Sequence, residues 1–436
     1  MSLQFITGGS GAGKSEYLSR LVCEESVRRP HDNFIVVVPE QYTMETQKKL
    51  VHMHSRKGIL NIDVVSFERL AYKVFEELGG GNRPVLDDTG KNLIVRRVLE
   101  KEKKKLDYFG SSIEKTGFVS ELKSVISELL QYGITPQQLG EIGENVKEKQ
   151  QLSAKLKDIR LVYKEFMAFL STNYITSEEI LDVLCGLVEK SKLIAGSEII
   201  FDGFTGFTPI QYKLMRLLLV YSKGIKISVT IDKKERPTGH EGWNNLFFMS
   251  KEMMNRLIAI CEEEGINVDD TVCVDRDINY RYEGAKDLAY LERNLFRYKG
   301  GVYTGTPENI RIYEGSNPKE ELQYIVSEIL QLTRKEGFRY RDIAVVTADL
   351  ETYGKVAANM MKQNDIPAFL DYKRSVASNP YVEMLCSALE IVEKGYPYDT
   401  MFRYLRTGLT GISRHDIDML ENYCLAVGIR GSRAWH

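Results

Sequence analysis

The sequence predicts an α/β protein whose parallel sheet is interrupted by a helical segment, and three observations support this class. A short apolar strand at 3–7 leads into a glycine-rich loop and an amphipathic helix. From about residue 88 to 194 nearly every stretch has helical periodicity. Strands and helices then alternate again, first over 198–231 and later from about 310. Such alternation is typical of a parallel sheet with helices on both faces.

The N-terminal elements are those of a doubly wound sheet. Phe34–Val38 is a continuous apolar run ended by Pro39, as expected for a strand that is covered on both faces. Ile62–Val65 is a further strand, and Ser66 can cap the helix that follows it.

The stretch over 88–194 is interpreted as a helical domain inserted into the sheet domain. Apolar side chains recur there at helical spacing, in one stripe over 118–130 and in another over 156–170. Capping signals punctuate the stretch at Thr135-Pro136 and at Thr176 with Glu179.

The second half predicts the return of the sheet and then a second α/β unit. We expect strands at 198–201 and 225–231, with a helix opening at Thr208-Pro209 between them. A polar stretch near Lys299–Glu308 is typical of a linker. Beyond it we expect the following elements: strands at 310–313 and 343–346, helices from Asn317 and after Asp349, and mainly helix after 376. The pattern stops without closing at 431–436, which predicts a piece of a longer protein.

Composition narrows the class of protein. Lys+Arg is 59 and Asp+Glu is 61, so the chain is not a generally basic DNA-coating protein, although a local basic channel remains open. The 6 cysteines include no C-x-x-C pair, which favours free thiols in a reducing compartment. Neither a signal peptide nor an apolar run of membrane-spanning length is present, so we expect a cytoplasmic protein without membrane contact.

The loop after the first strand carries the clearest chemistry. Its residues match G-x-x-x-x-G-K-[ST] and are Gly8, Gly9, Ser10, Gly11, Ala12, Gly13, Lys14 and Ser15. Glycines let backbone N–H groups turn inward around a phosphate, and the helix N-terminus behind the loop adds positive potential. Lys14 is placed to reach the β- and γ-phosphates of ATP, and the Ser15 hydroxyl to ligate Mg²⁺. The alternative is a loop kept for its tight turn, with no nucleotide bound.

Hydrolysis needs an acidic residue on a second strand, and Asp202 is the best candidate. It ends the apolar run Ile199–Phe201, where a carboxylate that binds Mg²⁺ is required. The next residue is Gly203, so the usual second acid is missing. The alternative for Asp202 is a turn residue at a strand end.

Candidate DNA contacts follow two of the predicted strands. Gln41, Tyr42 and Thr43 come just after a strand end, where ligand-binding loops gather in open sheets. Tyr42 could stack on a base and Thr43 could bind a phosphate, but an ordinary helix start explains the segment equally well. Ser66 and Phe67 carry the same ambiguity. The basic run Lys101–Lys105 is more typical of a solvated helix end than of a DNA contact.

These segments together resemble the B subunits of AddAB-type ATP-dependent helicase/deoxyribonucleases. The similar stretches follow the family's order, from TGGSGAGKS (7–15) through VVVPEQYTMETQ (36–47), VVSFERLAYKVF (64–75) and EIIFDGFTGFTPIQYKLMRLL (198–218) to IRIYEGSNPKEELQYIVSEI (310–329), RDIAVVTADLETY (341–353) and IPAFLDYKRSVASNPYVEML (366–385).

The resemblance implies a fold like that of UvrD-type superfamily 1 helicases. A first RecA-like domain would comprise 1–87 and 195–305, and the inserted helical domain would comprise 88–194. A second RecA-like domain would begin over 306–375, followed by a helical insertion at 376–436. Members of the family pair with a motor and nuclease A subunit to unwind and degrade double-strand DNA ends for homologous recombination. Their nuclease and iron–sulfur cluster belong to a C-terminal region that lies beyond this chain.

Departures from active UvrD-like helicases favour recognition over motor work. Only 7 residues precede the loop, which leaves no room for the upstream glutamine motif that reads adenine. Gly203 replaces the second acid, Asp232-Lys-Lys-Glu235 replaces a glutamine-containing coupling motif, and the arginines that sense the γ-phosphate are not placed. We therefore expect ATP binding with weak or no hydrolysis, in a DNA-recognition subunit. The alternative is a self-sufficient ATPase, either a translocase or a kinase.

Overall fold

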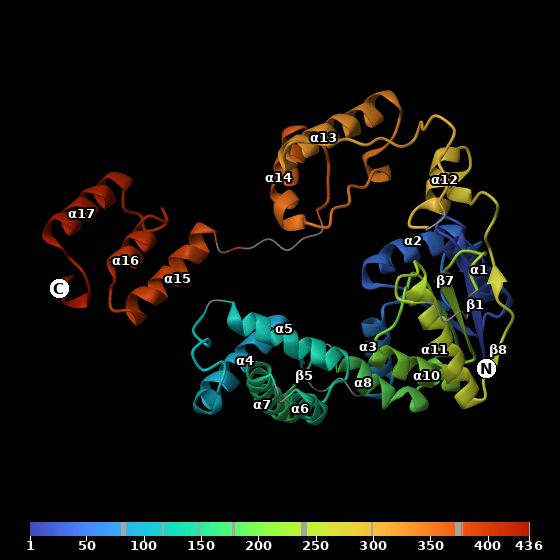
Figure 1. Cartoon of the computed structure of the whole chain (residues 1–436), viewed down its shortest axis with the longest axis horizontal. Coiled ribbons are helices and arrows are strands. Elements are labelled where there is room, and N and C mark those ends of the chain that lie inside the picture. The colour runs from blue at the N-terminus through green and yellow to red at the C-terminus, as the bar shows by residue number, and fades with distance from the viewer. Residues whose placement is uncertain are drawn as a thin grey trace. The chain divides into compact units, whose positions relative to one another are not determined.

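The computed structural model describes residues 1–435 apart from 80–83, 116, 147–148, 177–178, 237–241, 298–299, 371–375 and 377. The chain divides into two compact units, Met1–Ile310 and Arg311–His436, which are described separately below (Figure 1). The first residue of the expected linker, Lys299, and part of the family-like stretch 366–385 lie outside the described residues.

The first unit is built on a parallel sheet. Its strands are β1 (Ser2–Gly8), β2 (Asn33–Val37), β3 (Ile62–Val65), β6 (Ser197–Phe201), β7 (Gly224–Thr230), β8 (Asn267–Val268) and β9 (Val272–Cys273). Their order is β3-β2-β6-β7-β1-β8, and β9 also pairs with β1. Every pairing in this sheet is parallel. The five strands predicted in this part of the chain are therefore confirmed, and the class is α/β with a parallel sheet.

Successive strand residues alternate between two cores, because side chains along a strand point to opposite faces. Ile199 and Phe201 belong to the larger core, whereas Ile200 between them belongs to the other. The larger core is covered by α3 (Phe67–Leu78), α8 (Ile180–Cys185), α10 (Pro209–Tyr221) and α11 (Phe248–Glu264). The other core is covered by α1 (Lys14–Arg28) and α2 (Thr43–Met53). Both faces are therefore buried, which explains why these strands appear as continuous apolar runs.

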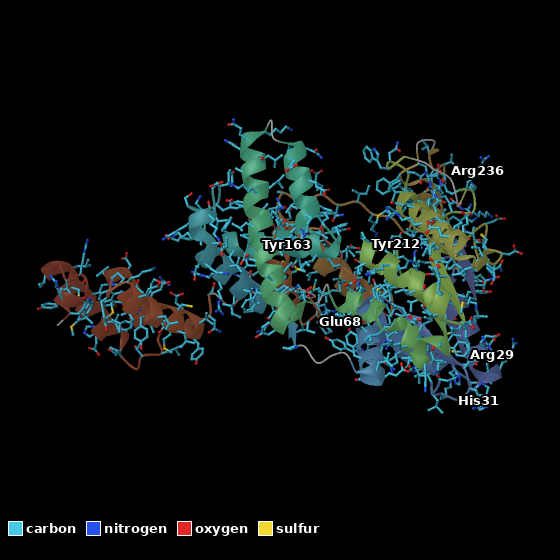
Figure 2. The ribbon with its side chains drawn as sticks, turned by 90° about the horizontal axis from the view of Figure 1, so that it is seen from below. Arg29, His31, Glu68, Tyr163, Tyr212 and Arg236 are labelled. Atoms are coloured by element: carbon cyan, nitrogen blue, oxygen red, sulfur yellow. The ribbon has the colours of Figure 1, made fainter. Side chains whose placement is uncertain are left out.

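Further helices of the first unit surround a core of their own. They are α4 (Asp88–Glu102), α5 (Phe118–Gln131), α6 (Pro136–Asn145) and α7 (Gln150–Asn173), next to the short pair β4 (Val85–Leu86) and β5 (Ile175–Thr176). The predicted capping box at Thr135 and Gln138 is present. Tyr163 of α7 donates its hydroxyl to the Ile134 carbonyl at 3.0 Å, and burial raises the pKa of Tyr163 to about 12 (Figure 2). The domain limits at 88 and 194 stay a prediction.

The second unit consists of α13 (Pro318–Lys335), α14 (Leu350–Gln363), α15 (Pro380–Glu393), α16 (Tyr398–Leu405) and α17 (Arg414–Val427). The predicted helix starts at Asn317 and Asp349 are confirmed as N-caps. The predicted strands at 310–313 and 343–346 are wrong for this structure, because both segments run without ladder pairing among the described residues. An apolar run forms a strand only beside a neighbour that takes its backbone hydrogen bonds, and here Ile312 is 95% exposed.

Shorter elements of the first unit include α9 (Lys192–Ala195), α12 (Lys286–Asn294) and the 3₁₀ turns at Glu40–Tyr42 and Tyr280–Tyr282. Among the helices of the described residues, none combines the length and the apolar composition that a membrane span requires.

A buried aspartate ties two distant parts of the α4–α7 bundle together, and its removal tests this packing. Asp158 is 1% exposed, and its carboxylate accepts the backbone N–H groups of Asp107, Tyr108 and Phe109 at 3.1, 2.8 and 2.9 Å. We expect Asp158→Ala to lower the free energy of unfolding by about 3 kcal/mol, because three backbone N–H donors lose a buried, charged acceptor. Urea denaturation followed by circular dichroism measures this change.

The matched control is Asp107→Ala, which removes an exposed carboxylate paired with Lys157 at 2.6 Å. Exposed ion pairs contribute little, so this variant should unfold like the parent chain. Equal effects of the two substitutions would contradict the assignment.

Candidate phosphate-binding site

Parallel pairing brings the ends of four strands to one edge of the sheet. The loop Gly8–Ser15 follows β1, and Glu40–Tyr42 follows β2. Asp202 follows β6, and Asp232 follows β7. Because the carboxyl ends of parallel strands face the same way, residues far apart in the sequence meet here.

The loop itself has the conformation that its glycines were expected to permit. Gly11 and Gly13 have φ of 73° and 95°, which side chains with a Cβ adopt only at a cost. Gly13 precedes α1, so the helix N-terminus opens directly onto the loop.

Lys14 lies folded over the loop. Its Nζ donates to the carbonyl oxygens of Gly8 and Gly9 at 2.8 and 2.9 Å. Burial lowers the pKa of Lys14, and the negative charges of Asp202 and Asp275 oppose that change. The ammonium is thus held by neutral carbonyl oxygens, for which an anionic phosphate oxygen is a stronger partner.

Asp202 follows β6 at the same edge of the sheet, and its negative charge raises the pKa of Lys14. The Ser228 hydroxyl donates to Asp202 Oδ1 at 2.5 Å and also accepts the Gly203 N–H at 3.3 Å. This pair of hydrogen bonds orients the carboxylate at the strand end. A carboxylate and the exposed Ser15 hydroxyl beside one lysine are oxygen ligands of the kind that Mg²⁺ takes.

Residues 272–282, which the sequence analysis missed, cover the outer side of the loop and are called the covering segment below. Asp275 Oδ1 accepts the Gly9 N–H at 2.7 Å. The Arg281 N–H donates to the Gly11 carbonyl at 3.3 Å, and a Cβ on Gly11 would lie 2.5 Å from Arg281 Cβ. A Cβ on Gly13 would lie 3.3 Å from the ring of Tyr280. Arg281, which belongs to the first unit, thus lies against the loop with both its backbone and its side chain.

The strand that carries this segment, β9, has too few residues for hydrophobic periodicity to reveal it in the sequence. Val272 and Cys273 of β9 pair with Ile6 and Thr7, and the Val274 N–H continues the ladder to the Thr7 carbonyl at 2.9 Å. Asp275 is therefore carried to the loop by two strand residues. The only hint in the sequence is a pair of valines that flank Cys273 and precede an aspartate.

The predicted DNA contacts divide into buried and exposed residues. Thr43 is buried and donates its hydroxyl to the Glu40 carbonyl at 2.9 Å, and the Ser66 side chain accepts the Arg69 N–H as the cap of α3. Phe67 is 8% exposed and packs on Phe201 with ring centroids 5.7 Å apart.

Gln41 and Tyr42 are exposed, Tyr42 by 49%. Thr43, Ser66 and Phe67 thus have structural roles, and DNA contact by these residues and by Gln41 and Tyr42 stays a prediction. In the basic run, Lys101, Lys103 and Lys105 pair with Glu165, Glu114 and Glu102, as expected of a solvated helix end.

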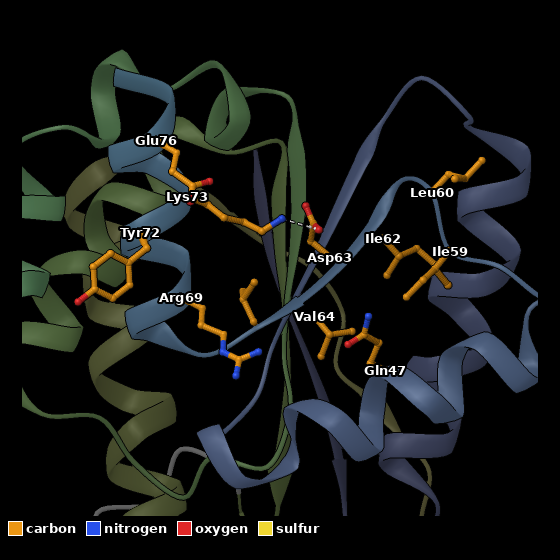
Figure 3. Close-up of a pocket in the computed structure, with 11 residues that line it drawn as sticks. Gln47, Ile59, Leu60, Ile62, Asp63, Val64, Arg69, Tyr72, Lys73 and Glu76 are labelled. Atoms are coloured by element: carbon orange, nitrogen blue, oxygen red, sulfur yellow. Dashed lines mark ion pairs between the residues drawn. The ribbon is translucent and has the colours of Figure 1, made fainter. Parts of the chain in front are cut away.

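A separate pocket lies at the outer edge of the sheet, along β3 (Figure 3). Lys73 and Asp63 form an ion pair of 2.6 Å within it. Strands β2, β6 and β7 separate β3 from β1, so this pocket is distinct from the Gly8–Ser15 loop.

The fold and the loop define a class, namely parallel-sheet α/β proteins with a glycine-rich loop between the first strand and the first helix. A family model described as "ADDB, N-terminal" matches residues 5–292. The chain belongs to this family.

Curated relatives share one description, since each is named as the B subunit of an ATP-dependent helicase/deoxyribonuclease. The protein of Lachnoclostridium phytofermentans is 42% identical over 434 residues, which are 99% of this chain and 38% of that protein. The protein of Caldanaerobacter subterraneus is 37% identical over 436 residues, covering 99% of this chain and 37% of that protein. The protein of Clostridium novyi is 34% identical over 435 residues, covering 100% and 38%. The chain thus spans somewhat more than a third of the length of these relatives.

The contact between Gly11 and Arg281 can be tested by adding a single methyl group. Gly11→Ala adds strain at positive φ of about 1 kcal/mol. It also forces Arg281 away, because real Cβ atoms do not approach as closely as 2.5 Å. We expect faster hydrogen exchange at the Arg281 amide, measured by mass spectrometry on the peptide that contains it.

Gly265→Ala is the matched control, since Gly265 has a φ of 66° and no heavy atom within 4 Å of an added Cβ. It should carry the strain of positive φ without loosening the covering segment. Unchanged exchange at Arg281 in the Gly11→Ala chain would show that the segment does not rest on the loop.

Proposed function

We propose that this chain binds ATP with Mg²⁺ at the Gly8–Ser15 loop, as the helicase-like, DNA-recognition part of a helicase–nuclease that processes double-strand breaks. The observation that carries the proposal is the meeting of this loop, Lys14 and Asp202 at one edge of a parallel sheet. We propose that the sheet of the first unit is a RecA-like domain with the α4–α7 bundle as its helical insertion. A second RecA-like domain would begin in the unit Arg311–His436.

Each group at the edge has a defined task in nucleotide binding. Inward N–H groups of the loop and the N-terminus of α1 bind phosphate oxygens. Lys14 exchanges the carbonyls of Gly8 and Gly9 for the β- and γ-phosphates. Ser15 and Asp202 hold Mg²⁺, with Ser228 keeping the carboxylate in place.

Binding of ATP does not imply its hydrolysis, and we propose that this chain has little or no motor activity. Position 203, where a second acid would orient the attacking water, is a glycine with φ of 84°. Loss of one group that stabilises a transition state costs about 3 kcal/mol, or roughly a hundredfold in rate.

A second candidate function, a self-sufficient ATPase, is favoured by one observation. Asp275 accepts the Gly9 N–H at 2.7 Å, and its charge and that of Glu292 raise the pKa of Lys14, whereas the charge of Arg281 lowers it. Carboxylates so close to the lysine could replace the missing acid as the group that orients water.

The names of the relatives support the wider role. They describe subunits of an ATP-dependent helicase/deoxyribonuclease. We propose that the chain works in the cytoplasm in a heterodimer with a motor and nuclease A subunit, on single strands that arise from duplex ends. Gln41 and Tyr42 are the exposed residues that we assign to these strands. The nuclease and the iron–sulfur cluster are proposed to lie outside this chain.

Loss of the loop lysine should weaken nucleotide binding. For Lys14→Ala we expect the Kd of ATP with Mg²⁺ to rise by roughly tenfold or more, equivalent to about 1.4 kcal/mol, because a charged partner of the phosphates is gone. Calorimetric titration with and without Mg²⁺ measures it. Lys104→Ala is the control, since Lys104 is exposed on the solvated helix end. Equal affinities of the two variants for ATP would show that Lys14 does not contribute to nucleotide binding.

The same substitution separates the two candidate functions at the level of activity. We expect the purified chain to turn over ATP slowly or not at all, and Lys14→Ala in the complete helicase–nuclease to leave the unwinding rate nearly intact. Stopped-flow unwinding and phosphate release are the measurements. Fast ATP turnover by the chain alone, abolished by Lys14→Ala, would favour the self-sufficient ATPase.

A further inference from the structure

Asp275 places a carboxylate on the loop in the manner of a bound anion. Its Oδ1 accepts the Gly9 N–H at 2.7 Å, and its Oδ2 accepts the backbone N–H of Lys233 at 2.9 Å. On its other side, Gly9 accepts the Lys14 ammonium at 2.9 Å through its carbonyl oxygen. Gly9 thus lies between the Lys14 ammonium, which would bind the terminal phosphates, and the negatively charged carboxylate of Asp275.

A second acid from α12 adds to this charge. Glu292 Oε1 lies 3.1 Å from the position that a Cβ on Gly9 would take, so its carboxylate lies beside the same residue. Burial raises the pKa of Glu292, and the nearby charges of Asp232 and Asp275 raise it further, while the charge of Arg297 and a hydrogen bond from the Ser10 backbone oppose them. The acids therefore already repel one another where a further anion would have to enter.

The loop backbone itself holds these acids in place. Asn279 donates Nδ2 to the Ser10 carbonyl at 3.4 Å and accepts the Arg276 N–H at 3.1 Å. The Arg281 N–H binds the Gly11 carbonyl at 3.3 Å. Because the covering segment is fixed to the loop at three consecutive residues, Gly9, Ser10 and Gly11, the position of Asp275 does not depend on one side-chain rotamer.

From this geometry we propose that Asp275, assisted by Glu292, determines the specificity of the site for the length of the phosphate chain. Its carboxylate occupies the Gly9 N–H and repels the terminal phosphate of a triphosphate, so the loop binds a nucleoside diphosphate more tightly than a triphosphate. A diphosphate uses the N–H groups nearer α1 and leaves Asp275 where it is. The inference rests on the proposed nucleotide binding and adds the preferred ligand.

The test compares ADP and ATP, each with Mg²⁺, by calorimetric titration of the full chain and of three variants. The parent chain should bind ADP at least about tenfold more tightly than ATP, a ratio that corresponds to about 1.4 kcal/mol. Asp275→Asn keeps an oxygen for the Gly9 N–H but removes the charge, and should reduce the ratio by about tenfold. Glu292→Gln should reduce it in the same direction and provides the test if Asp275→Asn lowers the melting temperature markedly.

Asp277→Asn is the matched control in the same segment. Asp277 is 98% exposed, and its carboxylate pairs with Lys233 at 2.8 Å. Removing this charge should leave the ratio of the two affinities unchanged.

The outcomes separate this inference from the proposed function. Equal binding of ADP and ATP by the parent chain, or a ratio unchanged in Asp275→Asn and Glu292→Gln, would overturn the inference while nucleotide binding stands. Binding of both nucleotides by the parent chain, with ATP affinity rising towards that of ADP in Asp275→Asn, would support both. Absence of nucleotide binding in the parent chain and in every variant would overturn both.

Discussion

The parallel pairing of β1 with its neighbours is the constraint on which the rest of the site depends. β1 is hydrogen-bonded to β7 on one side and to β8 and β9 on the other. Leu3 and Ile6, on opposite faces of the sheet, are fully buried. Because β1 is hydrogen-bonded on both sides and buried on both faces, the position of its carboxyl end is fixed. The loop that follows β1 is therefore held at the same end of the sheet as Asp202, Asp232 and Asp275. Chemistry at this edge is therefore a consequence of the sheet order.

The sequence predicted the parts of this architecture that depend on local pattern. Buried parallel strands appear as apolar runs, and β3 was found with its limits unchanged. The motif of the Gly8–Ser15 loop consists of consecutive residues. The N-caps at Ser66, Asn317 and Asp349 likewise depend on residues close in the sequence. Each of these features involves residues at most a few positions apart, where side-chain type determines backbone conformation.

What depends on distant contacts was missed or misjudged. Asp275 meets Gly9 across 266 positions of sequence, and only the pairing of β9 with β1 brings them together. The segments 310–313 and 343–346 show the opposite error, since an apolar run does not reveal whether a partner strand lies beside it. Phe67 and Thr43 follow the carboxyl ends of strands, yet their side chains are buried, a difference that position along a strand does not encode.

The central claim is that the Gly8–Ser15 loop binds nucleotide phosphates, and a crystal structure grown with Mg²⁺ and a non-hydrolysable ATP analogue tests it most directly. The account predicts phosphate density within the loop, the Lys14 ammonium turned from the carbonyls of Gly8 and Gly9 onto that phosphate, and Asp275 moved off the Gly9 amide. A loop without ligand density at saturating analogue, with Lys14 and Asp275 in their present positions, would contradict it.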